Sequence, residues 1–129
     1  MKSSNAKVVA VIEARMGSSR LPGKVLADIF GKPALERLIS RLQRCKELDD
    51  IVVATSTSPK DDSLAEWLKA NRIKFYRGSE DDVLQRVVDA SNSVNADIIV
   101  EITGDCILTD YELIDQGIQS FQANNCDVV

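Results

Sequence analysis

Histidine is absent from the 129-residue sequence. Without it, the chain cannot build a Ser-His triad, a histidine proton shuttle or a histidine-ligated zinc site. Any chemistry must therefore use carboxylates, lysine, arginine, backbone N–H groups and a hard metal ion. These groups suit the chemistry of phosphates, in which positioning and the neutralisation of negative charge dominate.

Cysteine and long apolar runs are also scarce. The three cysteines, Cys45, Cys106 and Cys126, stand far apart, form no CxxC pair and make no disulfide framework. No apolar run approaches the roughly 20 residues that span a bilayer, and no apolar signal-peptide core follows the polar start. We therefore expect one domain, located in the cytoplasm and without a membrane partner.

An excess of positive charge is lacking too, because the formal net charge is −4. Overall acidity argues against a nucleic-acid partner. The exception is residues 15–46, which hold eight cations and two acids. This basic stretch suits a small anionic ligand, and its later part, residues 37–46, is typical of the solvated face of a helix.

Apolar strands alternate with amphipathic helices along the chain. Apolar residues recur at helical spacing after Pro33, after Ser58-Pro59, after the capping-box-like segment 79–82 and after Asp110. Short apolar runs predict strands at 8–12, 50–55, 73–76 and 97–102, and the opening of a fifth strand at 126–129. This alternation predicts an α/β fold with a mostly parallel sheet and helices on both faces.

A polar segment follows each of the first four predicted strands. The four segments are residues 14–24, 55–56, 77–79 and 103–105. In parallel sheets of this kind, ligands bind beyond the carboxyl ends of the strands. We therefore expect all four segments to line one edge of the sheet.

Residues 14–24 are the most informative of these segments. They place two glycines, a proline, two serines and three cations in eleven residues. Small residues let backbone N–H groups crowd around an anion such as a triphosphate, and arginine and lysine neutralise it. The alternative is a basic surface loop shaped by glycine and proline. A P-loop is not favoured, because Gly17 and Gly23 are separated by five residues and Val25 replaces the magnesium-binding hydroxyl.

Three motifs resemble those of the sugar-acid cytidylyltransferases, which include the CMP-KDO and CMP-sialic acid synthetases. Residues 14–24 are similar to the loop A-R-x-x-S-x-R-L-P-G-K of these enzymes, and residues 77–84 are similar to a pattern of SpsF-like coat polysaccharide proteins. Gly104-Asp105, followed by Asp110, is the third motif. The resemblance covers essentially the whole sequence. It implies a three-layer, Rossmann-like nucleotidyltransferase fold, of which this chain would be the N-terminal half.

The resemblance also implies an activity: transfer of CMP from CTP to a sialic acid- or KDO-like sugar acid, with release of pyrophosphate, in surface polysaccharide biosynthesis. Arg15 and Lys24 would neutralise the phosphates, and Asp105 would hold Mg²⁺. Ile107 replaces the proline usual after Gly-Asp-x, and the second metal carboxylate of relatives has no counterpart before Val129. The residues implied to bind the nucleotide are Ala14, Arg15, Met16, Gly17, Ser18, Ser19, Arg20, Gly23, Lys24, Thr55, Ser56, Arg77 and Ser79.

The ligand and the extent of the site leave alternatives open. The enzyme could use another nucleoside triphosphate. Because the sequence stops inside an apparent strand, we interpret residues 1–129 as the nucleotide-binding part of a cytidylyltransferase domain, truncated at its C-terminus. A catalytically weak binding module is then an alternative. Two site residues also have structural alternatives: Ser79 could simply cap a helix, and Asp105 could cap or stiffen a loop. A homodimer is a further expectation from the resemblance.

Overall fold

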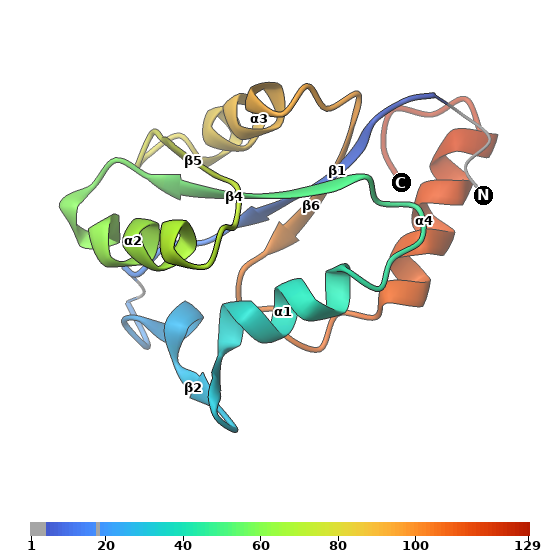
Figure 1. Cartoon of the computed structure of the whole chain (residues 1–129). Helices are drawn as coiled ribbons and strands as arrows, with labels where there is room; N and C mark the ends of the chain where they lie inside the picture. Colours follow the sequence, from blue (N-terminus) through green and yellow to red (C-terminus); the bar gives the residue numbers. More distant parts are fainter. Residues whose placement is uncertain (1–4, 18) are drawn as a thin grey trace.

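The computed structural model describes residues 5–17 and 19–129, in which strands and helices alternate (Figure 1). Ser18, one of the predicted binding residues, lies outside the described residues. The elements in chain order are β1 (Val8–Glu13), η1 (Lys24–Leu26), β2 (Asp28–Ile29), β3 (Lys32–Pro33), α1 (Ala34–Leu42), β4 (Asp50–Ser56), η2 (Pro59–Asp61), α2 (Asp62–Ala70), β5 (Phe75–Gly78), α3 (Val83–Ser93), β6 (Ile98–Thr103) and α4 (Tyr111–Ala123).

The central sheet has four strands in the order β5-β4-β1-β6, and every neighbouring pair is parallel. Strand β1 lies in the middle, with Val9 paired to Asp50 of β4 on one side and to Ile99 of β6 on the other. Its residues 8–12 are fully buried. A continuous apolar run is typical of a parallel strand that is covered on both faces. The predicted parallel α/β fold is therefore confirmed.

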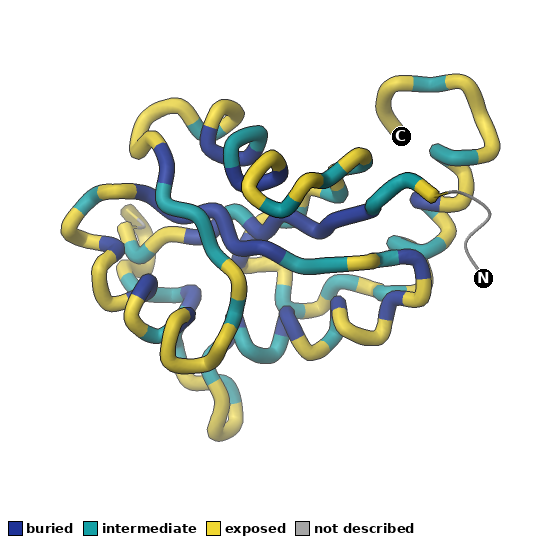
Figure 2. The backbone as a smooth tube through the Cα atoms, turned by 45° about the horizontal axis from the view of Figure 1, so that its top comes forward, coloured by how far each residue is buried: buried dark blue, intermediate teal, exposed yellow. Residues whose placement is uncertain are grey.

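Helices cover both faces of this sheet, so the fold has three layers (Figure 1). Ala10 and Ile12 of β1 pack with α1 and α2, whereas Val9 and Val11 point to the opposite face and pack with Val87 of α3. This division follows from the alternation of side chains along a strand. Figure 2 shows the most buried backbone running through the central strands, with exposed residues in the loops around them.

The helices are amphipathic and begin at recognisable caps. In α1, Leu35, Leu38 and Leu42 recur at helical spacing and are fully buried. The Asp110 carboxylate accepts a hydrogen bond from the Glu112 N–H at 2.9 Å and so caps α4, the helix predicted after Asp110. Within the described residues, no helix combines the length and the apolar character needed to cross a membrane.

Three local features differ from the sequence predictions. The third strand, predicted at 73–76, spans Phe75–Gly78, so residues 77–78 of the predicted polar segment lie within β5. The predicted fifth strand is wrong, because residues 126–129 form no strand in the described structure. A strand requires a neighbouring backbone, and the Cys126 N–H bonds locally to the Asn124 carbonyl instead. A hairpin of β2 and β3 was not predicted, since strands of two residues are too short to show periodicity.

Candidate active site

The carboxyl ends of the four parallel strands meet at one edge of the sheet, as predicted. Glu13 at the end of β1 pairs with Thr103 of β6 and with Ala54 of β4. Strands β4 and β5 follow on one side of β1, and β6 returns to its other side. The chain order therefore reverses between β1 and β6. Such a switch point is where parallel α/β sheets bind their ligands.

A pocket of about 390 Å³ lies at this point. It brings the basic loop after β1 together with the turn after β6. It contains seven of the predicted site residues, and Glu13 and Thr103 join them from the strand ends. The full lining is Glu13, Ala14, Arg15, Gly17, Ser19, Arg20, Lys24, Val25, Thr103, Gly104 and Asp105.

Lys24 and Asp105 form an ion pair across this pocket. The Lys24 Nζ lies 2.9 Å from the Asp105 Oδ2, and the two side chains are 37% and 50% exposed. The hydrogen bond from Lys24 lowers the pKa of Asp105 below its ordinary value, against a smaller opposing effect of burial. Asp105 is therefore ionised at neutral pH. A cation and a carboxylate thus face the same space, from positions 81 residues apart in the chain.

Gly23 shapes the end of the loop and directs Lys24. Its φ of 74° lies in the left-handed region, which glycine adopts without steric cost. Its N–H donates to the Met16 carbonyl at 2.8 Å, and this bond closes the loop on itself. The helical turn η1 then begins at Lys24. Met16 and Gly23, both predicted site residues, therefore lie in the loop frame and do not line the pocket.

The remaining predicted site residues lie along the β4–β5 end of the edge. The side chains of Thr55 and Ser56 are buried. Arg77 donates to the Ser56 carbonyl at 2.8 Å and pairs with Asp62 at the same distance. The Ser79 Oγ accepts the Asp82 N–H at 3.0 Å, so it caps the turn before α3, while Asp82 itself is the N-cap of α3. A role in ligand binding remains a prediction for these four residues.

Arg86 is a buried cation that the sequence analysis missed. It lies on α3 with no exposed surface. One guanidinium nitrogen donates to the Ser79 carbonyl at 2.8 Å, and another lies 3.4 Å from the Glu13 carboxylate. Arg86 thereby connects the loop after β5 to the end of β1. In the sequence it sits within the apolar run of a helix, which is the signal that could have indicated a buried arginine.

Asp61 is the second residue that was missed. Its carboxylate is buried and accepts hydrogen bonds from the Met16 N–H, at 2.7 Å, and from the Ser56 hydroxyl. In the sequence it belongs to Lys60-Asp61-Asp62 at the start of a helix, where acidic residues are common for reasons unrelated to a site.

Gly104 allows β6 and β1 to approach closely at the pocket. A Cβ atom at this position would lie 2.9 Å from the Glu13 carbonyl oxygen and from the Ala14 Cβ.

We expect Gly104→Ala to lower the free energy of unfolding by about 1–3 kcal/mol, because these neighbours are rigid. Urea denaturation measures the change. The matched control is Gly117→Ala in α4, where a Cβ meets nothing within 4 Å and helix propensity favours alanine by up to about 1 kcal/mol. Equal stability of the two variants would contradict this account.

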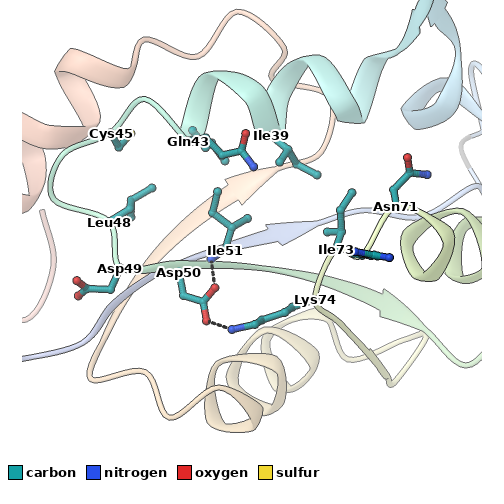
Figure 3. Close-up of a pocket in the computed structure, with 12 residues that line it drawn as sticks. Ile39, Gln43, Cys45, Leu48, Asp49, Asp50, Ile51, Asn71, Ile73 and Lys74 are labelled. Atoms are coloured by element: carbon teal, nitrogen blue, oxygen red, sulfur yellow. Dashed lines mark hydrogen bonds and ion pairs between the residues drawn. The ribbon is translucent and has the colours of Figure 1, made fainter.

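A second pocket, of about 400 Å³, lies at the opposite edge of the sheet (Figure 3). Several apolar side chains line it, including Ile51 and Ile73, which the figure shows near the start of β4 and of β5. Its Asp50 carboxylate is already neutralised by Lys74 at 2.6 Å. Because this pocket lies away from the basic loop, it is not the candidate anion site.

Comparison with known proteins agrees with this fold. The chain is 43% identical to the uncharacterised protein MJ1063 of Methanocaldococcus jannaschii, covering 95% of this chain and 51% of that protein. It is 38% identical to the spore coat polysaccharide biosynthesis protein SpsF of Bacillus subtilis, covering 88% and 49%. A solved structure of CMP:2-keto-3-deoxy-manno-octonic acid synthetase complexed with CTP is similar at 30% identity and a TM-score of 0.81, covering 92% and 48%.

The chain thus spans about half the length of the curated relatives it matches. The family described as cytidylyltransferase matches residues 9–129. The resemblance seen in the three motifs is confirmed, and so is the Rossmann-like nucleotidyltransferase fold. Because the match covers nearly the whole sequence, this chain belongs to the cytidylyltransferase family.

Proposed function

We propose that this chain binds CTP in the pocket between β1 and β6, as the nucleotide-binding part of an enzyme that transfers CMP to a sugar acid. The observation that carries the proposal is the convergence of the basic loop and Asp105, with Lys24 and Asp105 at 2.9 Å. A triphosphate needs cations around it, and Arg15, Arg20 and Lys24 line this pocket. The CTP complex of a similar synthetase supports the choice of nucleotide.

The reaction is a displacement at the α-phosphorus of CTP. An oxygen of the sugar hydroxyl forms a bond to this phosphorus, the bond from the phosphorus to the bridging oxygen of the β-phosphate breaks, and pyrophosphate leaves with the electron pair. The hydroxyl proton passes to water. Negative charge grows on the phosphate oxygens, and we propose that Arg15 and Lys24, which line the pocket, neutralise it.

We propose that the pocket also takes a magnesium ion, because it contains carboxylates. Mg²⁺ prefers oxygen ligands and takes one or two protein carboxylates together with phosphate oxygens. Asp105 is ionised, half exposed and already in contact with a cation, the Lys24 ammonium. Asp105 would therefore hold the metal, and Glu13 is the second carboxylate of the same pocket. When bound, Mg²⁺ would supply charge neutralisation for the phosphates. Among the described residues there is no cluster of three or more metal-ligating side chains.

The named relatives support a proposal for the acceptor and the setting. One is a synthetase for a 2-keto sugar acid, and another is a spore coat polysaccharide protein. We therefore propose a sugar acid as acceptor, in surface polysaccharide biosynthesis, with the enzyme in the cytoplasm. A catalytically weak nucleotide-binding module is the second candidate, because the chain spans about half of these relatives.

Nucleotide selectivity tests the proposal directly. In the presence of Mg²⁺, we expect CTP to raise the melting temperature by several degrees, and UTP, GTP and ATP to have smaller effects. A ligand at about 100 times its dissociation constant stabilises the native state by about 2.7 kcal/mol. Differential scanning fluorimetry measures the shift. Equal shifts with all four nucleotides would contradict CTP selectivity.

A pyrophosphate-release assay separates the two candidate functions. Release in the presence of CTP and a sugar acid supports the transferase. CTP binding without release supports the binding module.

A further inference from the structure

Asp61 occupies an unusual position between two loops of the candidate site. It ends η2, its residue is 2% exposed, and each carboxylate oxygen accepts a hydrogen bond from a different segment. One oxygen accepts the Met16 N–H, at 2.7 Å, from the basic loop after β1. The other accepts the Ser56 hydroxyl at the end of β4. The carboxylate therefore joins the exits of two neighbouring strands.

A buried carboxylate is a costly way to make this connection. Removing an ionised group from water costs several kcal/mol unless strong hydrogen bonds compensate. The two hydrogen bonds of Asp61, one on each oxygen, compensate this cost and hold the Met16 N–H, and with it the Arg15–Met16 peptide.

From Asp61, a continuous set of contacts leads to the reactive end of the pocket. The Met16 carbonyl accepts the Gly23 N–H at 2.8 Å. Gly23 directs the backbone into η1 at Lys24, and the Lys24 ammonium meets Asp105 at 2.9 Å. With Met16 held at both its N–H and its carbonyl, the loop between Arg15 and Lys24 has a fixed start and a fixed closure. Its orientation toward the pocket then depends on the Asp61 bond.

We propose that Asp61 is a positioning residue for the triphosphate-binding loop: its buried carboxylate holds the Arg15–Met16 peptide so that the loop cations face the pocket. The identity of the ligand rests on the function proposed above, whereas the tether itself does not. Asp61 does not line the pocket, so its effect passes through the loop.

Two substitutions at Asp61 separate the hydrogen bond from the charge. Asp61→Ala removes both acceptors. Asp61→Asn keeps an oxygen for the Met16 N–H and has nearly the same volume. Asp62→Asn is the matched control, because this neighbouring carboxylate is 59% exposed and pairs with Arg77 instead of the loop. Ser56→Ala removes one of the two bonds of Asp61 and keeps the proposal testable if Asp61→Ala does not fold.

Limited trypsin proteolysis measures the tether without any ligand. Arg15 and Arg20 are exposed trypsin sites within the loop. Mass spectrometry measures the rate of cleavage after these two arginines. We expect this rate to be at least about tenfold higher in Asp61→Ala, because local opening of the loop becomes easier. The cleavage rate of Asp61→Asn should be close to that of the unchanged chain. The rate of Ser56→Ala should lie between those of Asp61→Ala and the unchanged chain. The rate of Asp62→Asn should not change.

Binding of inorganic triphosphate with Mg²⁺, followed by calorimetry, measures the consequence for the site. We expect the dissociation constant for triphosphate to rise at least about tenfold in Asp61→Ala. In Asp61→Asn, it should return to the value of the unchanged chain. The comparison is made between variants with similar melting temperatures. The proposal is overturned if a folded Asp61→Ala, or Ser56→Ala where the former does not fold, shows unchanged cleavage and unchanged binding. It is also overturned if Asp61→Asn fails to restore the loop. If the unchanged chain binds neither triphosphate nor any nucleotide, the proposed function fails, and the cleavage rates alone decide on the tether.

Discussion

Replacing Lys24 with alanine is expected to lower turnover by about a hundredfold or more while the fold survives. A prearranged cation in a site poor in water is worth about 3–4 kcal/mol of transition-state stabilisation, by analogy with donors of an oxyanion hole. Lys24 is prearranged in this way, because Asp105 holds its ammonium in the pocket at 2.9 Å, while the Lys24 side chain is 37% exposed without a bound nucleotide. Pyrophosphate release in the presence of CTP and Mg²⁺ measures the loss, and CTP affinity measures it if the chain only binds.

The matched control for this prediction is Lys69→Ala. Lys69 is an exposed lysine in the last turn of α2, so its replacement changes the net charge equally without touching the pocket. Arg15→Ala is expected to behave like Lys24→Ala, because Arg15 also lines the pocket. Full activity in both pocket variants would refute the assignment of the loop.

Replacing Arg86 with methionine is expected to cause the largest loss of stability of any single substitution considered. Methionine keeps much of the buried stem but removes the guanidinium, which leaves the Ser79 carbonyl and the Glu13 carboxylate without this donor. Removing one partner of a fully buried ion pair costs about 3–5 kcal/mol, which is an upper bound here because the Glu13 side chain is 23% exposed. Domains of this size are stable by only about 5–15 kcal/mol. Urea denaturation followed by circular dichroism measures the change.

Arg44→Ala provides the comparison for this variant. Arg44 is an exposed arginine whose guanidinium lies 4.5 Å from the centre of the Tyr111 ring. An exposed cation–π contact is worth about 0.5–1 kcal/mol, so Arg44→Ala should remain close to the unchanged chain. If Arg86→Met also stays within about 1 kcal/mol, Arg86 does not hold the two loops together as the structure indicates.

The fold was predictable from the sequence because its main signals are local. Apolar runs such as 8–12 and helical spacings such as Leu35, Leu38 and Leu42 identify buried strands and covering helices within a few residues. The α/β class, the parallel sheet and the common edge of the polar segments followed from these patterns. The strand predicted at 126–129 was wrong because a strand depends on a partner backbone, which composition does not show.

The site was predictable only in part. The basic loop and Asp105 stood out because their residue types and spacing are uncommon. Arg77 and Asp61 show the limit of such reasoning. Arg77 was predicted to contact the ligand, and the structure adds a hydrogen bond to the Ser56 carbonyl at the end of β4, which the sequence did not indicate. Asp61 has the pattern of an ordinary acid in a first helical turn, yet it accepts a hydrogen bond from the loop after β1.

The sequence therefore predicted the order of the main strands and helices, a basic loop suited to an anion, and the family, since each is encoded in adjacent residues. Tertiary structure decided which distant groups meet. Lys24 faces Asp105 because β6 lies beside β1, and Asp61 reaches Met16 because β4 lies on the other side. Burial of Arg86 follows from the same arrangement. Such contacts depend on how strands pair, and residues far apart in the chain carry no local signal of their pairing.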